Sequence, residues 1–482
     1  MKRIDRRRFL TASALAGSMA ANAAPPPEEA VAAAKDVTRK LARYVVNARR
    51  DEVPAAVRKE ATRTLLNWVG CAVGGSRHET VDIAIRALSP FSGPAQAGVL
   101  GRKERLDVLN AALMNGISSH IFDFDDTHLR TIVHPAGPVA SAILALSEYR
   151  PVSGADLLHS LILGAEVECR IANAVYPAHY DVGWHITGTV GPFGAAAAAG
   201  KLLKLSEQQM VWALGLAATQ PVGLREMFGT MTKSFHPGRA AQNGFTAALL
   251  AAQNFTSSNQ GIEAARGWAN VLSTARNYGE ITDNLGAHYE ISVNTYKPFP
   301  CGIVIHPAID GCLQLRAQYR LAPQQVERIE LKIHPLVLEL TGKKAPQAGL
   351  EGKFSVYHAV AAAMVRGRVG EAEFSDQAVG EAAIVALRER VSAAIDRSIA
   401  EDQVRVTVTL KDGRRLEKYV EHATGSAKNP MTDAQLEGKF SGLAEGVLKP
   451  DRVRRLMDLC WNVEKLPAAA EIARAAAVPA RT

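Results

Sequence analysis

The sequence predicts a mainly α-helical protein, in which a large all-α domain receives an inserted, smaller α+β lid domain. Three observations lead to this fold class. Apolar residues recur at helical spacing from residue 36 to about 275, they alternate as in strands within residues 328–333 and 404–410, and helical spacing returns from 432 to about 475. The closing helices are therefore expected to pack back on the first domain.

The helical domain is expected over residues 36–288. Asp36 fits an N-cap for the first helix, and Pro54 suits the first turn of a helix that runs to Gly74-Gly75. Capping-box spacing is present for Ser153 with Asp156 and for Ser206 with Gln209. Further helices are expected near residues 78–88, 105–121, 136–148, 154–173, 189–203, 206–218 and 238–253. Because no strand-like run interrupts them, the domain should be all-α.

The α+β lid domain is expected over residues 289–431. Residues 289–295 and 328–333 alternate, and residues 404–410 and 415–420 predict a hairpin around an Asp412-Gly413 turn. Helices near 305–319, 354–365 and 376–387 should cover one face of the resulting sheet. The C-terminal helices are expected over residues 432–475.

The N-terminus is typical of an export signal. A basic stretch ends in Arg6-Arg7-Arg8-Phe9-Leu10, a modest apolar run follows over residues 11–20, and Ala21-Asn22-Ala23 fits a cleavage site. We predict a twin-arginine signal peptide over residues 1–23, a Pro-rich linker over 24–35, and a soluble periplasmic protein carried by the twin-arginine translocase. The apolar run is too short to span a bilayer. A short basic amphipathic helix is the alternative.

Charge and cysteine content narrow the function classes. The formal net charge of +8 falls to +4 if residues 1–23 are removed, which gives no argument for nucleic-acid binding and is compatible with an anionic substrate. The five cysteines are scattered, without Cys-x-x-Cys spacing. Neither a zinc site nor an iron–sulfur cluster is indicated, and a disulfide framework is not expected in so long a chain.

One segment concentrates chemistry-bearing residues at the end of a helical pattern. Close carboxylates shift each other's pKa values and imidazole titrates near neutrality, so such a segment suits proton transfer or metal binding. Its members are His120, Asp123, Asp125, Asp126, Thr127, His128 and His134.

Residues 123–128 with His134-Pro135 resemble the signature of the MmgE/PrpD family, the 2-methylcitrate dehydratase and cis-aconitate decarboxylase group. Three later stretches resemble the same family in order: 183–189 (GWHITGT), 232–238 (TKSFHPG), and 297–301 (KPFPC) with His306-Pro307-Ala308. The resemblance covers residues 36–470. It implies a helical domain with an α+β lid, a homodimer, and a site between the domains that needs no metal or organic cofactor.

The resemblance also implies site residues. Elimination from a polycarboxylate needs fixed cations for the carboxylates and a group that titrates near neutrality. We expect catalytic roles for Asp123, Thr127, His134, His185 and Lys297, and substrate binding by Lys233, His306 and His128.

Several of these residues also have plain structural interpretations. Asp123 or Asp126 could cap a helix, and Asp125 could support the loop. His128 could support the residues that contact substrate or lie on an exposed loop, and His185 could be a core histidine.

Two departures from the family's decarboxylases bear on the reaction. Gly302 stands where the decarboxylase pattern has histidine, which argues against decarboxylation. The loop from Thr127 to His134 is one residue longer than in decarboxylases, which affects the expected placement of His134.

The sequence therefore predicts a cofactor-independent lyase acting on a citrate-like polycarboxylate, by β-elimination of water or its reverse. Decarboxylation and epimerisation use the same groups and remain alternatives. Two other classes stay open: an envelope protein that binds organic anions without turnover, and a metal hydrolase built on Asp125, Asp126, His128 and His134.

Overall fold

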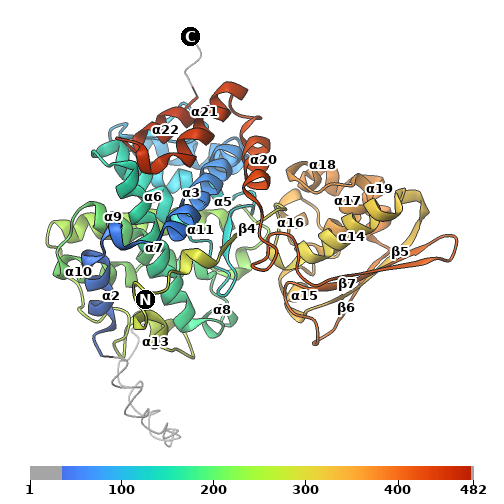
Figure 1. The fold of residues 1–482 in the computed structure, drawn as a ribbon, viewed down its shortest axis with the longest axis horizontal. Helices are drawn as coiled ribbons and strands as arrows, with labels where there is room; N and C mark the ends of the chain where they lie inside the picture. The colour runs from blue at the N-terminus through green and yellow to red at the C-terminus, as the bar shows by residue number, and fades with distance from the viewer. Residues whose placement is uncertain (1–34, 479–482) are drawn as a thin grey trace, which may run out of the picture. The chain divides into compact units, whose positions relative to one another are not determined.

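A computed structural model describes residues 35–478 of the chain (Figure 1). The predicted signal peptide, residues 1–23, lies outside the described residues, as does the predicted linker up to residue 34. Among the helices that are described, none is both long enough and apolar enough to cross a membrane.

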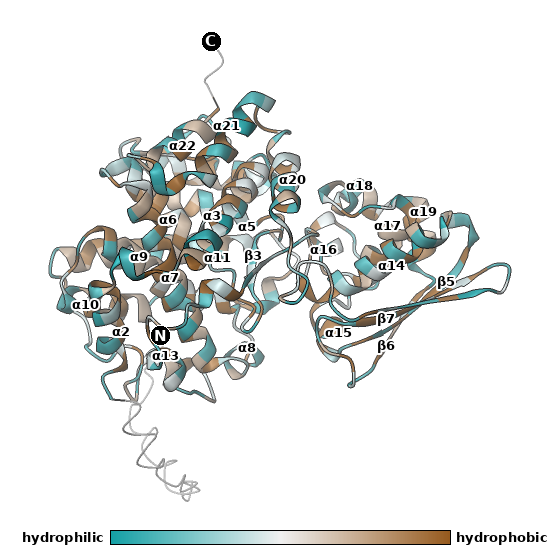
Figure 2. Cartoon of the chain, viewed as in Figure 1, coloured by the Kyte–Doolittle hydropathy of each residue, from teal (hydrophilic) through white to brown (hydrophobic). Residues whose placement is uncertain are grey.

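The described chain is mainly helical, as predicted, and the longer helices of its first part follow the expected positions closely. They are α2 (Val37–Asn47), α3 (Ala55–Gly75), α4 (Glu79–Leu88), α5 (Val108–His120), α6 (Ala136–Tyr149), α7 (Gly154–Val175), α9 (Ile186–Leu202), α10 (Glu207–Ala218) and α11 (Thr232–Ala252). Short helices α8 (Ala178–Asp181), α12 (Trp268–Leu272) and α13 (Gly279–Thr282) lie between or after them. Figure 2 shows mainly brown and white residues on α6 and α9, in keeping with their burial on nearly all sides.

The helix caps explain several of these boundaries. Ser206 and Gln209 form the reciprocal capping box that was predicted, and the Ser153 hydroxyl accepts the Asp156 N–H at the start of α7. Asp36 precedes α2 as expected, but its φ is 59° and its side chain makes no capping bond, so that part of the prediction is wrong. The helix expected from residue 238 begins six residues earlier, at Thr232, and includes Pro237.

The prediction of an all-α first domain is wrong in one respect, because two short antiparallel ribbons occur there. Strand β1 (Ala97–Gly98) pairs with β2 (Arg105–Leu106), and β3 (Asp126–His128) pairs with β4 (Asn294–Tyr296). Residues 289–295, expected as one strand, divide into a 3₁₀ turn (Glu290–Val293) and β4. Pairings of only two or three residues leave almost no signal in the local sequence.

A glycine contact sets the distance between α5 and α11. A Cβ atom on Gly116 would lie 2.4 Å from the Gly238 Cα, so the two helices meet backbone to backbone. His120 follows one turn after Gly116, and Lys233 lies five residues before Gly238. This crossing therefore brings an imidazole of α5 and an ammonium of α11 to the same place.

The α+β part contains a four-stranded sheet in the order β6-β5-β7-β8. Its strands are β5 (Val326–Ile333), β6 (Val391–Ile395), β7 (Val404–Leu410) and β8 (Arg415–Val420), with β5 and β6 parallel and the other pairs antiparallel. The predicted strand and hairpin are present, and β6 was not predicted. Figure 1 shows α14 (His306–Tyr319) and α17 (Val356–Arg366) along the sheet, and their apolar residues share one core with its strands. Shorter helices complete this part: α15 (Pro335–Thr341), α16 (Gly349–Gly352), α18 (Asp376–Val379) and α19 (Ala382–Arg388).

The chain closes with α20 (Asp433–Ala444), α21 (Pro450–Trp461) and α22 (Ala470–Ala476). Leu436, Phe440 and Leu456 belong to the same buried apolar cluster as Leu65 of α3. Gly70 leaves space for the Phe440 ring, because a Cβ there would lie 2.9 Å from it. The final helices thus contact the helices that open the described chain; the domain boundaries themselves stay predictions.

Candidate active site

The site is built on the loop that follows α5. Asp107 caps α5 at its start by accepting the N–H groups of Leu109 and Asn110. After the helix ends at His120, Asp123 adopts a φ of 52°, a left-handed conformation that Asp tolerates better than most residues. Strand β3 pairs with β4, and this pairing brings Lys297, the residue after β4, beside Asp123.

Asp123 holds two buried ammonium groups. Its Oδ1 accepts N–H groups from Lys233 at 2.8 Å and from Lys297 at 2.7 Å. Burial opposes ionisation of Asp123, but the two lysines outweigh it and hold the pKa of the carboxyl well below its usual value. Burial lowers the pKa of Lys233, and Asp123 opposes that shift. Asp123 is therefore an anion that orients two cations.

Each lysine keeps one N–H that these contacts do not use. An ammonium has three donors. Lys297 gives one to the Asp123 carboxylate and one to the Asp123 carbonyl at 3.1 Å, while Lys233 gives one to the same carboxylate and one to His120 Nε2 at 2.8 Å. The remaining donors can bind an anion in the cavity that both side chains line.

His120 links Lys233 to a second aspartate. Its Nδ1–H donates to Asp125 Oδ2 at 2.7 Å, which leaves Nε2 as the acceptor for the Lys233 ammonium. Burial lowers the pKa of His120 against the influence of Asp125, so the imidazole is neutral near pH 7. The result is a continuous chain of hydrogen bonds, Asp125–His120–Lys233.

His134 is held in one tautomer. Its Nδ1–H donates to the Asp126 carbonyl at 2.6 Å, with Thr127 Oγ1 3.3 Å away, and its backbone N–H donates to Thr187 Oγ1. Burial lowers the pKa of His134 to about 3, with Lys297 adding to the shift and Asp125 opposing it. The side chain therefore presents a neutral Nε2 lone pair, as a general base requires.

His185 is the residue that precedes α9, and its ring lies near those of His120 and His134. Its ring centroid is 5.8 Å from that of His120 and 6.3 Å from that of His134, and its Nδ1 lies 2.9 Å from Nδ1 of His236. Phe228 packs edge-on against the ring. Burial and Lys233 hold the pKa of His185 well below its usual value, so this imidazole is also neutral.

These groups surround a small cavity of about 30 Å³. Five predicted site residues line it: Asp123, His134, His185, Lys233 and Lys297. Its other walls come from both the helical and the α+β parts of the chain: Ile132, Tyr180, Phe228, Gly302, Ile303, Val304, Leu340, Thr341 and Phe354.

Three other predicted residues lie differently. Thr127 is fully buried and contacts His134 rather than the cavity. His128, expected to bind substrate, is also fully buried; its ring is bound to Thr131 Oγ1 at 2.7 Å and to Glu290 Oε2 at 2.9 Å. Both ring nitrogens are thus used by contacts within the protein and His128 does not line the cavity, so substrate binding by His128 stays a prediction. His306 lines a separate, larger cavity.

The aspartates of the loop divide their roles. Asp126 accepts the Ala136 N–H and an Asn294 amide hydrogen, so it holds the start of α6 and the β4 ribbon in place. Burial, aided by Asp125, raises its pKa to about 7. Asp125 is bound to His120 and supports that ring, in line with the structural role expected for it.

Two groups in the described chain bring metal-binding atoms together: His120 with His134 and His185, and His120 with Asp123, Asp125 and His134. Neither includes Asp126 or His128, so the ligand set of the metal-hydrolase alternative is not assembled. The Lys233 ammonium is bound to both His120 and Asp123 within 2.8 Å. A fixed cation at that distance repels a metal ion, so this donor set suits an ammonium better.

Sequence reasoning missed several residues that complete the site. His236 lies three residues after Lys233 on α11, so helical spacing could have placed both on one face. Lys439 of α20 donates to the carbonyl oxygens of Phe124 and Lys297, 2.5 and 2.9 Å away. Lys353 donates to the carbonyls of Phe122 and Pro300. These lysines fix the loops on which the site residues stand, and nothing local in the sequence marks them.

Comparison with known proteins agrees with the motifs. The MmgE/PrpD N-terminal domain matches residues 39–281, and the MmgE/PrpD C-terminal domain matches residues 299–463. The chain belongs to the MmgE/PrpD family. The family resemblance predicted from four ordered motifs is thus confirmed.

Named relatives of this family member include two kinds of lyase. Cis-aconitate decarboxylase from Aspergillus terreus is 26% identical over 462 residues, covering 89% of this chain and 94% of the relative. The human cis-aconitate decarboxylase is 27% identical over 460 residues, covering 90% and 92%. 2-Methylcitrate dehydratase from Salmonella typhimurium is 23% identical over 405 residues, covering 76% and 81%.

Proposed function

We propose that this protein is a lyase acting on a citrate-like polycarboxylate, and that it eliminates water from a hydroxy acid or adds it back. The observation that carries the proposal is a neutral His134 with a fixed tautomer in the same cavity as two lysines that share Asp123. Family membership supports lyase chemistry in general.

The first step belongs to His134. Its Nε2 takes a proton from the carbon next to a substrate carboxylate, and the free N–H of Lys297 binds that carboxylate as negative charge builds on it. A buried ammonium stabilises such charge more strongly than water does, because its donor is already oriented. Asp123 serves as the group that orients Lys297, not as the base, since its Oδ1 is already bound to the two ammonium groups.

The second step belongs to Lys233. As the C–O bond breaks, the leaving hydroxide takes a proton from the Lys233 ammonium and departs as water, and a C=C bond remains in the product. Burial lowers the pKa of Lys233, which makes it a better acid than an exposed lysine.

The proton held by His134 has a short route back to Lys233. His134 and Lys233 line the same cavity of about 30 Å³, which has room for about one water molecule. After the product leaves, a water molecule there takes the proton from His134 Nε2 and gives one to the neutral Lys233 amine, so both groups return to their starting states.

Dehydration is favoured over decarboxylation by the wall at Gly302. A Cβ atom there would lie 2.9 Å from the Thr341 methyl group, and Thr341 is fully buried, so a histidine at residue 302 would not fit in this chain without a shift of Thr341. Decarboxylation is the second candidate, supported by the names of the relatives that are 26–27% identical.

Proton NMR in deuterated water tests the proposal. The full chain is incubated with citrate, 2-methylcitrate, cis-aconitate and related acids. Interconversion of a hydroxy acid and its alkene, with deuterium at the carbon next to a carboxylate, is the expected result. Loss of CO₂ identifies decarboxylation, and exchange without elimination identifies epimerisation.

A pair of variants assigns the chemistry to the cavity. Lys297→Met removes an ammonium inside the cavity, while Lys201→Met removes a lysine of α9 that donates to the backbone carbonyls of Val45, Val46 and Ala48. Turnover should vanish in the first variant and persist in the second. Full turnover by Lys297→Met would exclude the mechanism, and unaltered substrates with folded wild-type protein would favour an anion-binding protein.

We further propose a periplasmic homodimer exported by the twin-arginine translocase, on the basis of residues 1–23 and the family resemblance. Replacing Arg6 and Arg7 by lysine should retain the protein in the cytoplasmic fraction. Light scattering should give twice the chain mass. A cytoplasmic wild-type protein, or a single-chain mass, would refute the respective proposal.

A further inference from the structure

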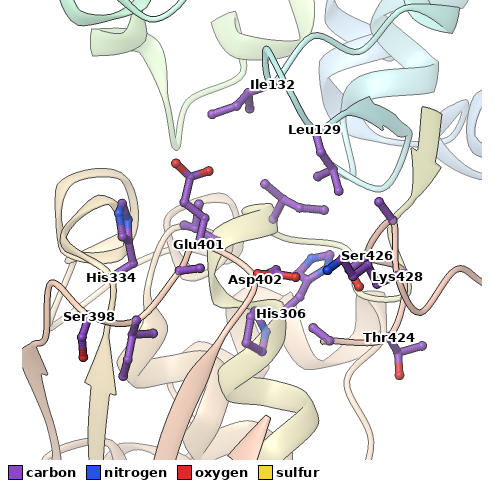
Figure 3. Close-up of a pocket in the computed structure, with 18 of the residues that line it drawn as sticks. Leu129, Ile132, His306, His334, Ser398, Glu401, Asp402, Thr424, Ser426 and Lys428 are labelled. Carbon is purple, nitrogen blue, oxygen red and sulfur yellow. The ribbon is translucent and has the colours of Figure 1, made fainter. Parts of the chain in front are cut away.

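Two imidazoles line the small cavity of the candidate active site, those of His134 and His185. His134 acts as the base in the proposed mechanism, in which His185 has no assigned step. Two further histidines, His306 and His334, line the neighbouring cavity of about 680 Å³ instead (Figure 3). What His185 can do to a substrate depends on which of its two ring nitrogens carries the proton.

His185 forms a hydrogen bond with another histidine, His236 of α11. The two Nδ1 atoms lie 2.9 Å apart, and both side chains are 2% exposed. Burial lowers the pKa of His236 to about 3 and holds the pKa of His185 well below its usual value, so both rings are neutral near pH 7. Two neutral rings joined through their Nδ1 atoms share a single proton, so one ring donates and the other accepts.

The two directions of this bond give His185 opposite properties in the cavity. If His185 donates, its Nε2 has a lone pair; if His236 donates, the Nε2 of His185 carries a proton. Within residues 35–478, no hydrogen bond involves the Nε2 of His185, whose ring lines the cavity. This nitrogen is therefore available to a ligand there.

The substrate determines which direction is useful. The oxygens of a carboxylate accept hydrogen bonds and donate none. A lone pair on His185 would therefore repel a bound carboxylate, whereas an Nε2–H would bind it. Lys297 binds one carboxylate in the proposed mechanism and Lys233 serves the leaving hydroxyl, so a second carboxylate of the substrate needs a further donor.

We propose that His236 is a positioning residue: its Nδ1–H donates to His185 Nδ1, and this bond keeps the proton of His185 on Nε2, where it binds a second carboxylate of the substrate. The inference rests on the proposed function, because the ligand is the same citrate-like polycarboxylate. His185 contacts the substrate, and His236 acts only through His185. Because the donor is oriented before the substrate arrives, binding orders fewer groups.

Nitrogen-15 NMR of the full chain, deuterated and labelled at its histidines, tests the direction of the bond. Long-range proton–nitrogen correlations distinguish a neutral imidazole protonated at Nε2 from one protonated at Nδ1. The variants His185→Gln and His236→Asn identify the signals of the two rings by their loss. The expected result is a His185 protonated at Nε2 and a His236 protonated at Nδ1. A His185 protonated at Nδ1 would overturn the inference.

Binding of propane-1,2,3-tricarboxylate tests the consequence for the ligand. This acid has three carboxylates and no hydroxyl, so it cannot lose water. In calorimetry on the full chain, His236→Leu should raise Kd by about five- to tenfold, because the orienting bond is lost. His236→Asn should stay within about twofold of wild type, since its amide can donate in place of the Nδ1–H. His159→Leu is the matched control and should keep the wild-type Kd, because His159 is a buried histidine of α7 outside the cavity.

Two binding results would also overturn the inference: a wild-type Kd for His236→Leu, or a loss in His236→Asn as large as in His236→Leu. If His236→Leu does not fold, the NMR spectrum of the wild type and the Kd of His236→Asn decide. If citrate-like acids react but His185 is protonated at Nδ1, the inference fails and the proposed function stands. If the protonation and the Kd values are as expected but none of the acids reacts, the inference stands and the proposed function fails.

Discussion

Replacing Asp123 by asparagine tests the ion cluster at its centre. The change keeps the size of the side chain, and asparagine tolerates the φ of 52° as well as aspartate does. It removes the one negative charge that both Lys233 and Lys297 contact. The two ammonium groups then remain buried without their counter-ion.

The expected cost follows from burial. Asp123, Lys297 and Lys233 are 3%, 1% and 7% exposed, so solvent screens the cluster little. Removing one partner of a buried ion pair costs about 3–5 kcal/mol. Because the amide oxygen can still accept one hydrogen bond, we expect a loss of about 3 kcal/mol in the free energy of unfolding, at the lower end of that range.

The pH dependence of this loss has a defined sign. The lysines depress the pKa of Asp123 in the folded protein, so its contribution to stability is complete above the unfolded pKa of about 3.9. The contribution is lost as the pH falls through the lower folded value. The difference between wild type and Asp123→Asn should therefore be constant from pH 8 to 5 and shrink below about pH 4.

Urea denaturation of both proteins across this pH range measures the difference. Asp156→Asn serves as control, because the pair of Asp156 with Arg50 is largely exposed; its loss should stay within about 1 kcal/mol. An Asp123→Asn protein as stable as wild type at pH 7, or a difference that grows on acidification, would refute the reasoning.

Three further predictions concern the side chains of His134, His128 and Phe440. His134→Gln should lower kcat by about 10²–10⁴-fold. His128→Gln should lower the free energy of unfolding, because the bond to Glu290 is lost, and should leave kcat within a few-fold of wild type. Equal losses of kcat in steady-state assays of the two variants would contradict this. Because the pKa of His134 is lowered to about 3, kcat should not fall as the pH drops from 8 through 6.5, and a pH–rate profile with an acid limb near 6.5 would exclude His134 as the base. Phe440→Ala should destabilise the chain by about 3–5 kcal/mol in urea, since the ring is 1% exposed against α3, and a change under 1 kcal/mol would show that α20 does not complete that core.

The helices and the main hairpin could be predicted because their signals are local. Apolar spacing located α3 and α7 within a few residues, and Asp412-Gly413 located the turn between β7 and β8, where Gly413 has a φ of 90°. Strand β6 was missed because Val391–Ile395 is short and acquires its conformation only by pairing in parallel with β5.

The sequence could predict which residues belong to the candidate site, but it could not predict most of the contacts between them. Motif spacing named Lys233, Lys297, Asp123 and His134, which line one cavity. It could not show that Asp123 is committed to the two lysines, because that contact joins residues 110 and 174 positions apart. The contact of His128 with Glu290 could not be predicted for the same reason, because the two residues are 162 positions apart.

The β3–β4 ribbon bears on how this protein could be divided. The two family domains match residues 39–281 and 299–463, and β4 and Lys297 fall in the interval that neither covers. This interval is not a spacer, because it supplies one of the two lysines on Asp123 and a strand that pairs with the loop after α5. Dividing the chain after residue 281 would therefore separate Lys297 from Asp123 and break up the site. A variant in which the C-terminal domain is exchanged for that of a relative should keep residues 282–298 joined to the helices before them.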